Sequence, residues 1–181
     1  QFALQAPDLI VQVAIRYWNS GRSDEASELL GRAFEANPED PEMIVVGALL
    51  STINKSADAD VWAQELALLA EKTNLPTAIR EQIEITKMIL EKNEVGQIIK
   101  SSAGLNRWRN ETLFLCAIGD LASESNRPEI ASNAYRLALT STEPSSSPLN
   151  SRLIYSLWSE GKILESFRVA SEYAGSSQSI R

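Results

Sequence analysis

Breaks between helical segments recur along this chain about every 34 residues, and this period restricts the fold more than any other feature of the sequence. The breaks fall near Gly21, Ala57, Asn93, Asn126 and Gly161. Each period holds two segments with apolar residues at helical spacing. Because one pair of helices cannot bury its apolar faces alone, each pair must stack on its neighbours. The sequence therefore predicts an all-α chain of five stacked helical hairpins.

Ten helices follow from the apolar spacing and from the residues that stop helices. They are expected at 7–20, 23–37, 43–53, 61–73, 77–92, 94–102, 111–125, 128–140, 149–160 and 163–174. Ser23 is expected to cap the second helix, since serine side chains accept hydrogen bonds from the first amides of a helix. Pro128 stands at a first helical position, where the missing N–H of proline costs nothing. A fraying polar tail is expected after residue 174.

Composition supports a helical domain and disfavours two classes of partner. The chain has 181 residues, of which 44% are hydrophobic and only 7% aromatic. This is enough apolar surface for a core and favours helices over aromatic-rich strands. The formal net charge is −7, and nucleic acids and anionic membranes bind concentrated basic faces. No apolar run approaches the roughly 18 residues that span a bilayer, so neither nucleic-acid binding nor membrane insertion is expected.

The sequence offers little of the chemistry that enzymes and metal sites use. It contains no histidine and one cysteine, Cys116, which an apolar helix surrounds. A general base active near neutral pH, a thiolate zinc site and a disulfide framework are therefore excluded or disfavoured. The carboxylate pairs Asp24-Glu25 and Glu39-Asp40 lie in predicted first turns and loops, where they suit the helix dipole. We expect a protein that is not an enzyme and needs no metal or cofactor.

Residues of the first hairpin lie at the signature positions of a known repeat. They are Ile10, Val13, Ala14, Tyr17, Gly21, Ala26, Leu30, Ala33 and Pro38. The fourth hairpin has a matching set, Leu115, Ile118, Gly119, Ala122, Ala131, Tyr135 and Ala138, and the fifth a weaker one, Leu153, Leu157, Gly161, Ser166 and Ala170. In this pattern the chain resembles the tetratricopeptide repeat family, whose small residues let two helices approach closely. The segment between Pro41 and Ala103 departs from the signature.

The resemblance implies a right-handed α-solenoid that forms one domain over residues 1–181. Its five repeats would span about 7–40, 41–75, 76–109, 110–145 and 146–181. In such repeats the first helices line a concave face, and ligands usually lie in that groove. Carried over in register, the partner-binding groove would be lined by Val11, Ile15, Trp18, Val45, Leu49, Ile53, Tyr155 and Trp158, with Asp120 and Glu124 making its middle acidic.

An apolar groove of this kind predicts a function in binding rather than in catalysis. We expect a protein–protein interaction scaffold that takes a peptide, a helix or a partner subunit in the concave groove. Three other arrangements would hide the groove: a flanking helix of a longer parent protein, a second copy of the chain, or tighter superhelical curvature. A separate feature, Arg107-Trp108-Arg109, could stack a base or a sugar ring, or could pack as an inter-repeat connection.

The alternative function places the chain inside a larger machine. The sequence starts without Met, so it is expected to be part of a longer protein. That protein could be a bacterial envelope, exopolysaccharide export or secretion protein, in which the repeats recruit a modifying enzyme or contact the polymer. A homo-oligomer and an intramolecular contact with the parent chain stay open, as does a cytoplasmic or periplasmic location of a soluble protein.

Overall fold

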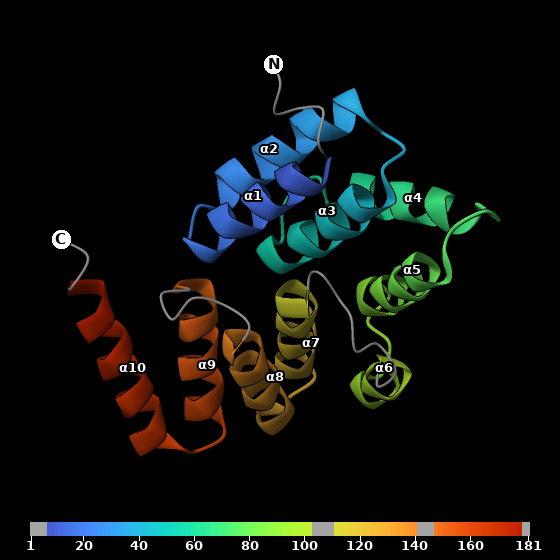
Figure 1. Ribbon diagram of the computed structural model, residues 1–181. Coiled ribbons are helices and arrows are strands. Elements are labelled where there is room, and N and C mark those ends of the chain that lie inside the picture. The colour runs from blue at the N-terminus through green and yellow to red at the C-terminus, as the bar shows by residue number, and fades with distance from the viewer. Residues whose placement is uncertain (1–6, 103–110, 141–146, 179–181) are drawn as a thin grey trace.

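The computed structural model describes residues 7–102, 111–140 and 147–178, and their secondary structure is helical. Figure 1 shows the helices in chain order. They are α1 (Pro7–Asn19), α2 (Ser23–Ala36), α3 (Pro41–Asn54), α4 (Ala59–Ala70), α5 (Thr77–Leu90), α6 (Val95–Ser102), α7 (Glu111–Glu124), α8 (Pro128–Thr140), α9 (Ser147–Ser159) and α10 (Ile163–Gln178). The all-α prediction and the ten expected helices are confirmed.

The helix ends agree with the prediction at α8 and differ from it at α2 and α10. Helix α8 begins at Pro128 as expected. Ser23 does not cap α2, because it is the first helical residue and the preceding Arg22 makes no side-chain cap bond. A side-chain cap is found instead at α3, where Asp40 Oδ1 accepts from the Met43 amide at 2.8 Å. Helix α10 continues to Gln178, beyond its predicted end at residue 174.

All five hairpin turns close with the same backbone motif. The turn residue adopts a positive φ in each, at Gly21, Lys55, Lys92, Asn126 and Gly161. The amide after it donates to the carbonyl five residues earlier, from Arg22, Ser56, Asn93, Arg127 and Lys162 to Tyr17, Ser51, Met88, Ala122 and Leu157. This is the Schellman closure of a helix C-terminus. The turn residues are 34, 37, 34 and 35 apart, so the sequence period is also a structural period.

Close contacts within two hairpins depend on a glycine facing an aromatic ring. A Cβ placed on Gly47 of α3 would lie 2.4 Å from the Trp62 ring of α4, and one on Gly119 of α7 would lie 2.3 Å from the Tyr135 ring of α8. Both rings are buried. Ala14, at the corresponding small position of the first hairpin, is also buried. The small residues therefore set the helix spacing, as the sequence pattern predicts.

The array of hairpins bends back on itself. In Figure 1 the first two hairpins lie above the last two, with α5 on the right below α4 and α6 below α5, beside the later helices. Contacts follow this arrangement: α1 packs on α9 and α3 packs on α7, in addition to the contacts between successive helices. Helix α3 is buried without a gap from Met43 to Ser51. The core therefore lies between the first two hairpins and the later ones, here called the two halves of the chain, with α3 at its centre.

Candidate functional site

The structure places the predicted groove residues of the first two hairpins in the core. Five of them, Val11, Trp18, Val45, Leu49 and Ile53, are buried, and Ile15 is half-buried against the same core. The expectation that these six side chains line an open groove is wrong. Helices α7 and α9 cover them, because the later hairpins fold back onto α1 and α3. The predicted groove residues are therefore hidden by other helices of the same chain.

A half-buried ion pair joins the first two hairpins to the later ones where they meet. Arg152 of α9 donates through Nε to Asp120 Oδ1 of α7 at 2.8 Å, and through Nη2 to the Ile53 carbonyl at the end of α3 at 3.1 Å. The Tyr135 hydroxyl donates to the same Asp120 oxygen at 2.7 Å. Burial, followed by the nearby Asp120 charge, raises the pKa of Tyr135. The phenol therefore stays a donor, and Arg152 links three helices from different hairpins.

The groups that sequence reasoning considered for acid–base or thiol chemistry occupy structural positions. Cys116 is fully buried, and this burial raises the pKa of its thiol well above the usual value, which leaves little reactive thiolate. Asp24 and Glu25 lie in the first turn of α2, and Asp40 caps α3. Within residues 7–102, 111–140 and 147–178, no group of three or more acidic, cysteine or histidine side chains could hold a metal ion.

A small recess of about 360 Å³ lies between α3, α4, α5 and α7. Its floor includes Ile53, Ile89 and Leu121, and at its rim Glu124 pairs with two lysines. Lys92 Nζ lies 3.0 Å and Lys55 Nζ 3.2 Å from the Glu124 carboxylate oxygens. The hydrogen bond from Lys92, reinforced by Lys55, holds the pKa of Glu124 below its usual value.

This pairing predicts a pH dependence of stability that Glu124→Gln removes. A carboxyl whose pKa is lowered by folding stabilises the fold above its unfolded pKa of about 4.3 and loses that contribution as the pH falls through the lowered value. Wild type is therefore expected to lose stability more steeply than Glu124→Gln between about pH 5 and pH 3. Urea unfolding at a series of pH values measures this. Parallel curves would contradict the role given to the two lysines.

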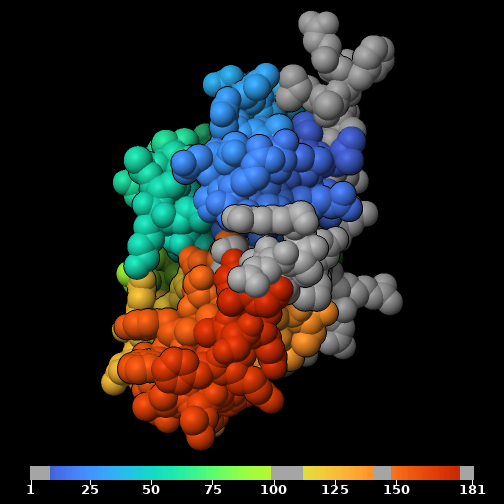
Figure 2. Space-filling view, turned by 90° about the vertical axis from the view of Figure 1, so that its left-hand side faces the viewer, coloured from blue at the N-terminus to red at the C-terminus, as the bar shows by residue number. Residues whose placement is uncertain are grey.

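The exposed apolar surface of the described residues gathers on the last hairpin. Its members, here called the C-terminal patch, are Tyr155 (66% exposed), Trp158 (55%), Ile163 (44%), Leu164 (88%) and Phe167 (60%). Trp158 of α9 and Phe167 of α10 meet edge to face with ring centroids 6.2 Å apart. In Figure 2 this hairpin, coloured orange to red, forms the lower part of the face toward the viewer. Two predicted groove residues, Tyr155 and Trp158, thus reach solvent.

Sequence reasoning missed the three patch residues on α10. The turn residues Asn126 and Gly161 set the register, so Leu164 corresponds to Glu129 of α8 and Phe167 to Ser132. At these positions the fourth hairpin has polar side chains, whereas the fifth has large apolar ones. The family signature gives the same 35-residue offset, for example from Ala131 to Ser166, but it does not include the positions of Leu164 and Phe167, so these residues were not compared.

Three further findings concern the chain as a whole. The Arg107-Trp108-Arg109 feature lies outside the described residues. None of the described helices is long and apolar enough to cross a membrane. No protein-family model, curated protein or solved structure matches this chain.

Proposed function

We propose that this chain is a non-catalytic interaction scaffold built as a tetratricopeptide-like α-solenoid, and that it binds a protein partner through the C-terminal patch. The repeat class is supported by five identical turn closures in phase and by small residues at the helix crossings. The non-catalytic role is supported by a sequence without histidine and by the buried thiol of Cys116. These features suit packing between helices rather than bond-breaking chemistry.

The observation that carries the proposal is the concentration of five large apolar side chains on one exposed hairpin. Single exposed apolar residues are normal on protein surfaces, but a contiguous apolar patch marks an interaction site. Aromatic side chains are enriched among the residues that dominate binding energies. The patch contains Tyr155, Trp158 and Phe167, whereas the other exposed large apolar residues of the described chain are aliphatic and are spread over α1, α4 and α8: Leu9, Val61, Leu68 and Leu137. The patch therefore replaces the buried groove as the partner-binding surface.

A photo-cross-linking residue at position 167 tests this in the cell that makes the protein. We expect an adduct from position 167 and none from position 68, because Phe167 (60% exposed) lies in the patch and Leu68 (58%) lies on α4. The two sites are matched in exposure, so exposure alone cannot explain a difference. The absence of an adduct at 167, or the same adduct from both positions, would refute the patch as a partner-binding surface.

A further inference from the structure

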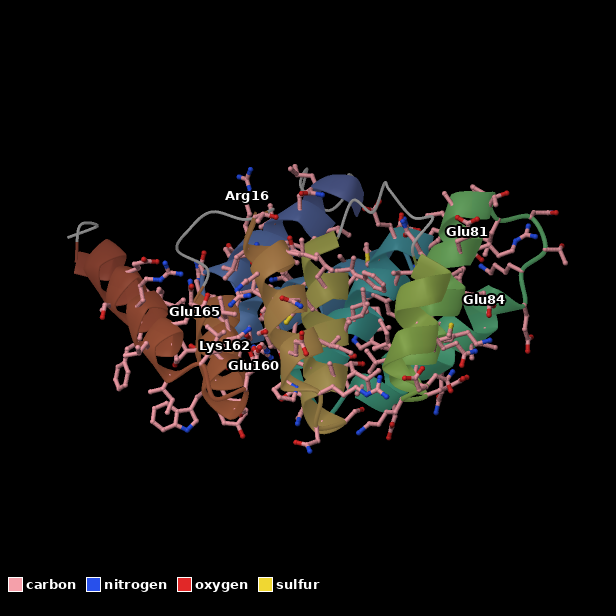
Figure 3. The ribbon with its side chains drawn as sticks, turned by 90° about the horizontal axis from the view of Figure 1, so that it is seen from below. Arg16, Glu81, Glu84, Glu160, Lys162 and Glu165 are labelled. Carbon is pink, nitrogen blue, oxygen red and sulfur yellow. The ribbon has the colours of Figure 1, made fainter. Side chains whose placement is uncertain are left out.

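The junction between the fourth and fifth hairpins shows how this chain joins one hairpin to the next. Ser132 Oγ of α8 donates to Glu160 Oε2 at 2.9 Å, and Lys162 also pairs with Glu160. One turn further, Arg136 Nη2 lies 2.8 Å from Glu165 Oε1. Figure 3 shows Glu160, Lys162 and Glu165 together beside this junction. Polar residues of α8, the second helix of the fourth hairpin, thus bond to residues of the fifth hairpin.

On α10 the same positions carry different chemistry. Phe167 stands where α8 has Ser132, and Leu164 stands where α8 has Glu129. Ser132 is fully buried by its junction, whereas Phe167 and Leu164 are exposed. Phe167 therefore leaves an apolar, exposed side chain at the position of Ser132 and cannot repeat its bond to Glu160. Ser171 stands at the position of Arg136, and Leu164 at that of Glu129, which is exposed on α8 as well.

Charge does not oppose the approach of a second copy to this hairpin. Residues 147–178 carry three acidic and three basic side chains, so the hairpin has no net charge although the whole chain carries −7. A second molecule of a chain with charge −7 is repelled least at a neutral surface. Two copies can therefore approach at this hairpin at low electrostatic cost, as they could at residues 77–102, which carry four acidic and four basic side chains; the exposed apolar side chains set the last hairpin apart.

The size of the patch matches what a dimer requires. With side-chain areas of roughly 150–250 Å², the exposed fractions of its five members correspond to roughly 600 Å² per copy. Two copies would then bury about 1,200 Å², the lower end of specific protein interfaces. An apolar surface of this area is sufficient for a weak to moderate homodimer.

From this exposed, apolar, neutral and adequately sized surface we infer that the partner of the C-terminal patch is a second copy of this chain, bound patch to patch about a two-fold axis. This inference rests on the proposed function, because it names the partner of the same surface. A two-fold axis between Leu164 and Phe167 brings Leu164 of each copy against Phe167 of the other, so both contacts are apolar. The dimer leaves the rest of each array free.

Sedimentation equilibrium of the full chain over a range of concentrations tests the inference. Wild type is expected to form a dimer, and Leu164→Glu to weaken it at least about thirtyfold, since a charge would enter an apolar contact. Leu68→Glu is the matched control and should dimerise like wild type. Because Leu164 is 88% exposed, its replacement leaves the fold intact, which circular dichroism checks.

Disulfide trapping tests the geometry. A mixture of Leu164→Cys and Phe167→Cys chains should form more mixed dimers than either variant alone forms homodimers. Cys116 is fully buried and does not compete.

Two results would overturn the inference: a wild type that stays monomeric, or a dimer that Leu164→Glu and Phe167→Glu leave unchanged. The cross-linking experiment at position 167 distinguishes failure of the dimer from failure of the proposed function. A monomeric wild type whose position 167 cross-links to a different protein keeps the scaffold and rejects the second copy. A monomer without any adduct at 167 rejects both.

Discussion

Replacing Arg152 with methionine is expected to lower the free energy of unfolding by about 2–4 kcal/mol. The substitution leaves the Asp120 carboxylate without its cation and the Ile53 carbonyl without the guanidinium donor, while the side-chain volume is largely kept. Both groups lie at the contact between the first two hairpins and the later ones, where the Asp120 side chain is half-buried. Chemical unfolding followed by circular dichroism measures the effect.

Arg168→Met is the matched control for this prediction. Arg168 lies on the same hairpin, but its side chain is 68% exposed and pairs with Glu165 and Glu172 on its own helix. Surface pairs of this kind contribute about 0–1 kcal/mol. Equal losses from the two arginine substitutions would show that Arg152 does not hold the halves together. A double-mutant cycle with Asp120→Asn separates the ion pair from the bond to Ile53.

Replacing Gly119 with alanine is expected to destabilise the protein by about 1–3 kcal/mol or more through overpacking. The added Cβ would lie 2.3 Å from Tyr135, and the ring cannot move away easily because it is buried and its hydroxyl is bonded to Asp120. Thermal or urea unfolding of the purified variant measures the loss. The comparable substitution Gly47→Ala against Trp62 should act in the same direction.

Gly31→Ala is the control that separates a steric effect from helix propensity. Gly31 lies within α2, and an added Cβ there meets nothing within 4 Å. Alanine in an open helical position stabilises by about 0.5–1 kcal/mol relative to glycine. The two substitutions are therefore expected to have opposite signs. A stabilising Gly119→Ala would contradict the close helix crossing between α7 and α8.

The local structure of this chain could be predicted from its sequence because local signals determine it. The apolar spacing predicts each helix, and Gly21, Asn126 and Gly161 were recognised at turns where a positive φ is required. Lys55 and Lys92 also adopt a positive φ, although lysine is not a residue type that indicates this conformation. The predicted breaks at Ala57 and Asn93 therefore fall one or two residues beyond the turn residue.

The long-range packing could not be predicted by comparing neighbouring repeats. Assigning the first helices to an open concave face made Val11, Trp18 and Leu49 groove residues, whereas contacts between distant hairpins bury them. One sequence signal was available. Residues 43–50 are apolar on every side of the helix, and a helix of that kind is packed all round. A concave helix open to a ligand would keep a polar face instead.

The return of the chain onto itself also determines how it unfolds. In a linear array each hairpin contacts only its neighbours, so its stability is a sum of local terms and the ends can open separately. Here α1 packs on α9 and α3 packs on α7, so removing either end uncovers the other. The expected consequence is one cooperative transition, with a folding rate limited by closing a loop of more than a hundred residues, from α1 to α9. A protein built from local repeats would then fold with the contact order of a globular domain.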